Sequence, residues 1–165
     1  MIPTGSSISY EVVPYQIEYR AHVASLVLLL DEWFEPDAWS DIDEELGPDT
    51  TLIAVDQDDD VIGFVVVKLT GDNAGRITWA GVDPSYHRMG VGKALIESVI
   101  REATDAGLDA LYVETMSDNV EYEPFARTRA FYAALGFQAY LELGDTAGNG
   151  LATTDWVLDL VGQPV

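Results

Sequence analysis

The sequence contains no cysteine and almost no lysine, which is limited to Lys68 and Lys93. Without cysteine the protein can form no disulfide, no thiolate metal site and no cysteine nucleophile. The two histidines, His22 and His87, lie far apart in the chain, and His22 is expected to be an ordinary helix residue. The sequence therefore predicts no metal site.

Long apolar runs are also missing. No stretch of about 18 apolar residues is present, which excludes a membrane-spanning helix and a membrane partner. The N-terminus lacks the basic region and apolar core of a secretory leader, so we expect a cytoplasmic protein. What is present is a 165-residue chain with 48% hydrophobic and 10% aromatic residues, enough for the core of a single domain over residues 1–165.

Positive charge is scarce, with 8 basic residues against 29 acidic ones, a net charge of −21 and a pI near 4.1. Nucleic acid is therefore not expected as a partner, because its binding requires Lys and Arg at the phosphates. The acidic surface could attract cationic amines, or it could suit a cytoplasm of high salt; the dispersed acids favour the second interpretation, a halophile. Half of the basic residues nevertheless fall in two segments, which contain Arg88, Lys93, Arg127 and Arg129.

Hydrophobic periodicity and turn residues predict alternating strands and helices. Helices are expected at 16–30, 37–46, 90–106 and 126–135. Strands are expected at 8–13, 51–55, 61–69, 77–82, 108–115, 137–143 and 153–160, the second to fourth as an antiparallel meander. The strand, helix and strand over 77–115 should form a parallel crossover.

Two clusters in these segments leave alternatives open. Trp33, Phe34 and Trp39 could belong to the core or form one wall of an acceptor pocket. The run Asp58-Asp59-Asp60 is typical of a solvated hairpin turn, and it lacks the ligand spacing and the distal Glu of a calcium loop.

The stretch Val82 to Leu95 (VDPSYHRMGVGKAL) joins an expected strand to an expected helix through Gly90 and Gly92. The first N–H groups of such a helix are unpaired and lie at the positive end of its dipole, so they suit a phosphate. A Walker A loop is excluded because His87 and Ala94 replace its first Gly and its Ser or Thr. A dinucleotide fingerprint is excluded because Leu95 replaces its third Gly.

The stretch resembles the coenzyme A loop of the GCN5-related N-acetyltransferase (GNAT) family, which has the pattern Val-x-Pro followed by Arg/Gln-x-x-Gly-x-Gly/Ala. The Arg/Gln position falls on His87, so either His87 takes that place or Arg88 supplies the positive charge. The resemblance implies the acyl-CoA N-acyltransferase fold, an α/β (α+β) domain with a mixed, mostly antiparallel sheet of about seven strands and about four helices.

A second segment supports this resemblance. The run from Arg127 to Phe137 (RTRAFYAALGF) is similar to the family's closing motif, in which a helix with a Tyr runs into Leu-Gly-Phe. Taken alone, Tyr132 could equally be a core aromatic residue. Both motifs occur in the expected order on the expected elements, and the resemblance covers residues 52–137.

The resemblance implies transfer of an acetyl group from acetyl-CoA to an amine by direct attack in a ternary complex. Cofactor-binding residues would be Val82, His87, Arg88, Met89, Gly90, Val91, Gly92 and Lys93. An N–H near Gly81 or Val82 would stabilise the oxyanion. Tyr132 would protonate the leaving thiolate, and Glu114 would act as the base, unless it is only a solvated carboxylate or a partner of Arg127 or Arg129.

Two other classes of function stay open at this stage. A non-catalytic acyl-CoA sensor or regulatory domain would keep the glycine loop and need neither Tyr132 nor Glu114. A nucleotide-binding regulator would respond to ATP instead of coenzyme A. The sequence does not identify the acceptor, a small-molecule or peptide amine, and leaves the oligomeric state open, a homodimer included.

Overall fold

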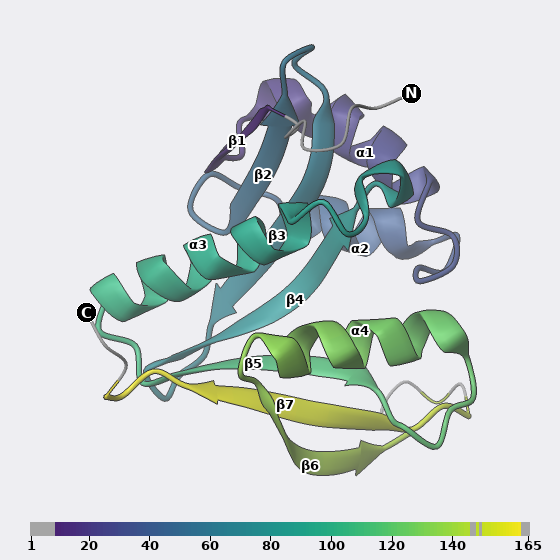
Figure 1. The fold of residues 1–165 in the computed structure, drawn as a ribbon, viewed down its shortest axis with the longest axis vertical. Helices are drawn as coiled ribbons and strands as arrows, with labels where there is room; N and C mark the ends of the chain where they lie inside the picture. Colours follow the sequence, from purple (N-terminus) through teal and green to yellow (C-terminus); the bar gives the residue numbers. More distant parts are fainter. Residues whose placement is uncertain (1–8, 146–147, 149, 163–165) are drawn as a thin grey trace. The chain divides into compact units, whose positions relative to one another are not determined.

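In a computed structural model, which describes residues 9–145, 148 and 150–162, seven strands form one mixed sheet in the order β1-β2-β3-β4-β5-β7-β6 (Figure 1). The strands are β1 (Tyr10–Pro14), β2 (Thr51–Asp56), β3 (Val61–Leu69), β4 (Ala74–Val82), β5 (Ala110–Met116), β6 (Gln138–Gly144) and β7 (Thr153–Asp159). The α-helices are α1 (Arg20–Leu28), α2 (Ala38–Glu45), α3 (Val91–Asp105) and α4 (Glu123–Ala134). Within the described residues, no helix is both long and apolar enough to cross a membrane.

The chain divides into two compact units. The first contains the residues up to Val66 together with Trp79–Val99, and the second contains Val67–Thr78 and the residues from Ile100 onward. The single-domain assignment over 1–165 stays a prediction.

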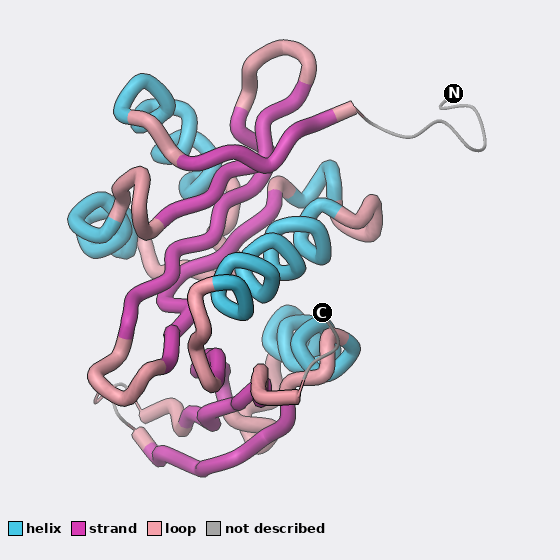
Figure 2. Tube along the Cα trace, turned by 90° about the vertical axis from the view of Figure 1, so that its left-hand side faces the viewer, coloured by secondary structure: helices cyan, strands magenta, loops and turns pink. Residues whose placement is uncertain are grey.

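In the first unit, helices cover both faces of the strands (Figure 2). Phe64 of β3 is fully buried in a core with residues of α1 and α2, including Val23, Leu26 and Ile42. The neighbouring Gly63 must point to the opposite face, because side chains alternate along a strand. There a Cβ would come within 2.9 Å of Leu95 of α3, so the missing side chain lets α3 start close to the sheet.

In the second unit, α4 lies over β5 and β7 (Figure 1). β4 pairs with β5 in parallel from Ala74↔Ala110 to Ile77↔Val113, which confirms the predicted crossover through α3. β5 and β7 are antiparallel, as are β7 and the edge strand β6.

The largest differences from the predicted element boundaries concern α1, β4 and α4. α1 is preceded by a 3-10 turn at Ile17–Tyr19 and ends at Leu28, before the predicted limit. β4 begins at Ala74, because the turn before it is short, and α4 begins at Glu123 with Pro124 in its first turn, a position that proline favours. The predicted start of the first strand at residue 8 and part of the turn at 144–150 lie outside the described residues.

Candidate active site

The loop before α3 exposes a set of backbone N–H groups. The first helical hydrogen bond runs from Ala94 N–H to the Gly90 carbonyl (2.9 Å), and none of the N–H groups of residues 90–93 has a backbone acceptor in the described part of the chain. Arg88 and Gly90 both have left-handed backbones, with φ of 64° and 84°. For a non-glycine residue this conformation is uncommon, and such residues cluster at functional sites as well as in turns. The arrangement suits a phosphate anion.

His87 does not extend away from this loop. Its Nε2 lies 2.9 Å from the Val82 carbonyl oxygen, and its ring meets the edge of Trp33 with centroids 5.4 Å apart. The next N–H along the chain, that of Asp83, donates to the Ile62 carbonyl (2.9 Å). The peptide unit that ends β4 is therefore held from both sides.

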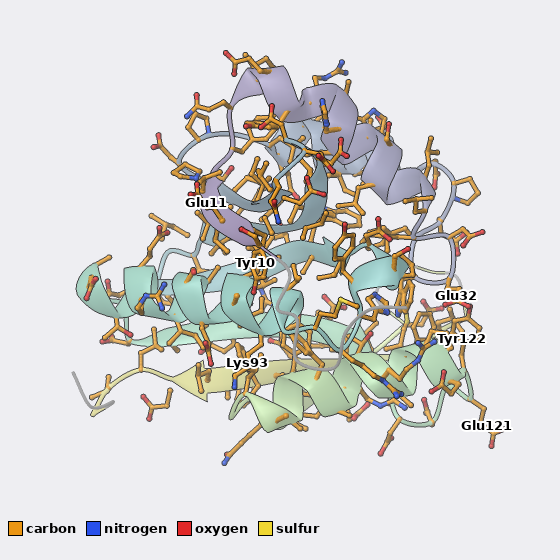
Figure 3. All side chains as sticks on the ribbon, turned by 45° about the horizontal axis from the view of Figure 1, so that its top comes forward. Tyr10, Glu11, Glu32, Lys93, Glu121 and Tyr122 are labelled. Carbon is orange, nitrogen blue, oxygen red and sulfur yellow. The ribbon has the colours of Figure 1, made fainter. Side chains whose placement is uncertain are left out.

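The charged and aromatic neighbours of the loop have defined positions. Arg88 is exposed, and Lys93 forms a long ion pair with Glu97 (3.8 Å) on the surface of α3. Tyr10 extends from β1 and Lys93 from the first turn of α3 (Figure 3). The Tyr10 hydroxyl donates to the Gly90 carbonyl at 3.4 Å, a contact that the sequence did not predict.

The aromatic cluster after α1 packs against the core of the first unit. Trp33, Phe34 and Trp39 are partly buried there, and the Phe34 ring meets Trp79 of β4 edge-on at 5.7 Å. A Cβ at Gly81 would collide with Leu30, so this glycine allows the turn after α1 to approach β4 closely. The core interpretation of the cluster is confirmed, while its role as an acceptor wall stays a prediction.

Tyr132 is fixed by the way α4 ends. Gly136 has φ of 97°, its N–H donates to the Ala133 carbonyl, and the Phe137 N–H donates to the Tyr132 carbonyl (both 3.1 Å). This is a Schellman cap, which usually includes an apolar contact between the residues in the places of Tyr132 and Phe137. Their rings do meet, with centroids 5.4 Å apart. The Leu-Gly-Phe motif therefore positions the tyrosine through its cap.

Burial affects the acidity of Tyr132. The residue is 5% exposed, and this burial raises the pKa of its hydroxyl above the ordinary value of 10.0. A tyrosine hydroxyl is protonated at neutral pH even at the ordinary value, and the raised pKa makes it a weaker acid. Tyr132 can therefore donate a hydrogen bond at neutral pH, while its role as a proton donor stays a prediction.

Glu114 lies on β5 and is exposed, between the buried residues Val113 and Thr115. Its carboxylate accepts a hydrogen bond from Thr153 Oγ1 (2.6 Å). Thr115 faces α4, because Trp156 Nε1 donates to it and Trp156 lies in a pocket with residues of α4. Since side chains alternate along a strand, Glu114 lies on the opposite face of the sheet from α4.

A buried ion pair borders Glu114 on that face. Arg76 binds both carboxylate oxygens of Asp155 (2.7 and 2.9 Å), and Asp155 is the cross-strand neighbour of Glu114. The hydrogen bonds that Arg76 donates to Asp155, followed by the smaller attraction of Asp155 and Glu114, raise the pKa of Arg76 above its ordinary value. Arg76 thus stays cationic next to Glu114, a relation that no local sequence motif indicated.

Arg127 and Arg129, the basic residues of the second segment noted in the sequence, form local contacts. Arg127 pairs with Glu123 (2.7 Å) on the surface of α4. Arg129 donates to the carbonyls of Met116 and Ser117 (3.1 and 3.2 Å). The predicted cofactor residues Val82 and 87–93 lie in the first unit, and Tyr132 and Glu114 lie in the second.

Comparison with known proteins shows which family the chain resembles in sequence and fold. Residues 15–137 match the acetyltransferase (GNAT) family. The [ribosomal protein bS18]-alanine N-acetyltransferase of Escherichia coli K12 is 30% identical over 136 residues, which are 81% of this chain and 80% of the relative. The mycothiol acetyltransferase of Actinosynnema mirum is 29% identical over 110 residues, which are 67% of this chain but 31% of that larger protein.

Among solved structures, an aminoglycoside 6′-N-acetyltransferase complexed with coenzyme A has the same fold, with a TM-score of 0.74 at 16% identity over 94% of this chain and 99% of that one. The chain belongs to the GNAT family of acetyltransferases. It is an enzyme that moves an acetyl group from acetyl-CoA to an amine.

Proposed function

We propose that the protein acetylates a primary amine of a small molecule or peptide by direct attack of the amine on acetyl-CoA in a ternary complex. The observation that carries this proposal is the set of N–H groups without a backbone acceptor at the start of α3, among the residues that the structure describes. These groups suit the pyrophosphate of the cofactor. Family membership supports the chemistry, since acetyl-CoA is the shared cosubstrate.

The loop residues would bind different parts of acetyl-CoA. Backbone N–H groups of Arg88, Met89, Gly90, Val91, Gly92 and Lys93 would hold the pyrophosphate, although the Met89 N–H already donates to the Tyr86 carbonyl (3.3 Å). The exposed Arg88 and Lys93 would add positive charge. Val82 would offer its N–H to the thioester oxygen as negative charge develops there. His87 would act through the Val82 carbonyl, which it contacts at 2.9 Å, and not through the phosphate.

Tyr132 and Glu114 would handle the two protons. Tyr132, which is protonated at neutral pH, would donate to the thiolate of coenzyme A as it leaves. Glu114 would take a proton from the attacking ammonium, directly or through water. The C–N bond to the amine would form as the C–S bond to coenzyme A breaks, with one proton lost from the nitrogen and one gained by the sulfur.

The acceptor amine belongs either to a peptide or to a small molecule. The relative with 30% identity is named for the alanine of a ribosomal protein, which favours a peptide N-terminus, while the mycothiol relative favours a small molecule. Turnover of acetyl-CoA should be measured across N-terminal peptides, amino acids, polyamines and aminoglycosides. Turnover with at least one amine class is expected; coenzyme A binding with no turnover on any of them would favour the sensor alternative.

The role of Glu114 has its own test. Glu114→Gln keeps the acceptor for Thr153 but cannot take a proton, so kcat should fall by roughly 10- to 1000-fold. Asp118→Asn on the loop after β5 is the matched control and should leave kcat unchanged. An unaltered kcat in Glu114→Gln would show that Glu114 is not the base and is only a solvated carboxylate.

We also propose that the acidic surface adapts the enzyme to a cytoplasm of high salt. The formal charge of −21 on 165 residues supports this proposal. Strong screening would remove the repulsion between these charges.

A further inference from the structure

The second unit contains a pocket that has no role in the proposed acetyl transfer. Its volume is about 310 Å³, at the lower end of the range for small-ligand sites. α4, the loop after β5, β6 and β7 form its walls, with Asp118, Arg129, Ala130, Ala133, Glu142 and Trp156 among the lining residues.

Glu142 is held in place within this pocket by two hydroxyl groups. Thr154 Oγ1 donates to one carboxylate oxygen (2.7 Å) and Ser117 Oγ to the other (3.0 Å). Both donors are buried, with exposures of 4% and 1%. An ionised carboxylate accepts about four hydrogen bonds, so Glu142 can still accept from a ligand.

Arg129 supplies the opposite charge. Among the described residues, Arg129 donates to the carbonyls of Met116 and Ser117, and both hydrogen bonds use Nη1. A guanidinium carries five N–H donors, so those on Nη2 and Nε can face a ligand. Within the described residues, no ion pair joins Arg129 to Glu142 or Asp118, although all three line one pocket.

The remaining walls are apolar. Trp156 is oriented by the bond from its Nε1 to Thr115 Oγ1 (2.9 Å), and it presents its ring to the pocket. Ala130 and Ala133 of α4 leave the space that larger side chains would fill. The pocket therefore combines fixed charges of both signs with an apolar surface.

We propose that this pocket binds a small zwitterion, an α-amino acid with an apolar side chain. Glu142 and Asp118 would bind the ammonium group, Arg129 would bind the carboxylate, and the side chain would lie against Trp156 and the alanines. This site is distinct in its residues from the cofactor loop and from Tyr132 and Glu114.

Calorimetric titration with L-leucine and two analogues tests the proposal. 3-Methylbutylamine lacks the carboxylate of leucine, and 4-methylpentanoate lacks its ammonium group. Leucine should bind with a Kd in the millimolar range or tighter, and each analogue should bind at least about tenfold more weakly, as expected for loss of a charge-assisted hydrogen bond. No leucine binding, or an analogue that binds as tightly as leucine, would overturn it.

Variants locate the binding within the molecule. Ala133→Leu should fill the pocket and abolish leucine binding, whereas Ala134→Leu, at an exposed position of α4 outside the pocket, should preserve it. Glu142→Gln, which needs no rearrangement of α4, should weaken leucine binding at least about tenfold. If Ala133→Leu failed to fold, Glu142→Gln would decide the matter. Leucine affinity equal to that of the parent in folded Ala133→Leu or in Glu142→Gln would contradict the assignment.

Discussion

At the scale of single residues, Tyr132 shows how a side chain can serve both packing and chemistry. Its ring meets Phe131 at 5.1 Å and Phe137 at 5.4 Å, as a core residue would. The same burial raises the pKa of its hydroxyl, because ionisation would place a charge in an apolar site. The core and catalytic interpretations of the sequence are therefore compatible.

Tyr132→Phe separates the two roles. The ring contacts remain in the variant, so its stability should change little, while kcat should fall by roughly 10- to 1000-fold because the proton donor is lost. Steady-state kinetics and a coenzyme A titration measure both effects, and cofactor affinity should be nearly intact. Tyr140→Phe, on the exposed edge strand β6, is the control and should keep full activity. Full activity in Tyr132→Phe as well would leave only the packing role.

The position of His87 could not be predicted from its neighbours in sequence. The motif suggested a residue that faces the phosphate, yet the ring lies against Val82 and Trp33. Trp33 is more than fifty residues away in the chain, and only the packing of the α1–α2 connection brings it there. Contacts of Tyr10 with Gly90, and of Arg76 with Asp155, are long-range in the same sense.

At the scale of elements, two helices end in the same way. Gly107 and Gly136, with φ of 78° and 97°, follow α3 and α4, and the residues after them donate back to Ala103 and Tyr132. The sequence predicted both ends correctly because glycine is the residue that adopts this conformation without strain.

Replacement of these glycines by alanine compares a cap near the site with one that is remote from it. Both variants should lose about 1 kcal/mol of stability, because a Cβ disfavours the left-handed backbone. A Cβ at Gly136 would meet Leu158 at 3.4 Å, an ordinary contact, and one at Gly107 meets nothing within 4 Å. Because the cap at Gly136 positions Tyr132, Gly136→Ala should also lower kcat, and Gly107→Ala should not. Thermal melts measure the loss of stability, and steady-state kinetics measure kcat. An equal kcat in the two variants would show that the cap at Gly136 has no effect on catalysis.

Most of the elements were predictable because each has a strong periodic pattern and turn residues at its ends. The start of α4 was placed three residues late, because Pro124 was taken as part of the loop and not as a first-turn residue. The order of strands β5, β7 and β6 follows from pairing between distant segments, and local patterns carry no information about it.

At the scale of the whole molecule, the main feature is the excess of negative charge. The chain has 29 acidic residues and 8 basic ones, and several basic residues form ion pairs, such as Arg20 with Asp43 and Arg76 with Asp155. The hydrogen bond from Arg20 lowers the pKa of Asp43 below its ordinary value. The stabilisation from this pair is therefore present above the unfolded-state pKa and is lost as the pH falls through the lowered one.

Salt should stabilise the protein. At about 1 M salt the Debye length falls to about 3 Å, which removes most of the repulsion among the acidic residues. Melting temperatures should rise between about 0.1 and 2 M KCl, and coenzyme A, itself an anion, should bind more tightly as the global field is screened. A flat or falling melting temperature would count against the adaptation to salt, and an affinity that drops steadily would show that Arg88 and Lys93 govern binding.

The central claim is that backbone N–H groups at the start of α3 hold the cofactor, and Gly92→Val tests it most directly. A side chain at Gly92 should block the approach of the pyrophosphate to the backbone. The parent should bind coenzyme A with a micromolar Kd, and the variant should bind at least about tenfold more weakly. Gly71→Val is the control, because a Cβ there meets nothing within 4 Å, and it should bind like the parent. Calorimetric titration that found parental affinity in folded Gly92→Val would contradict the account.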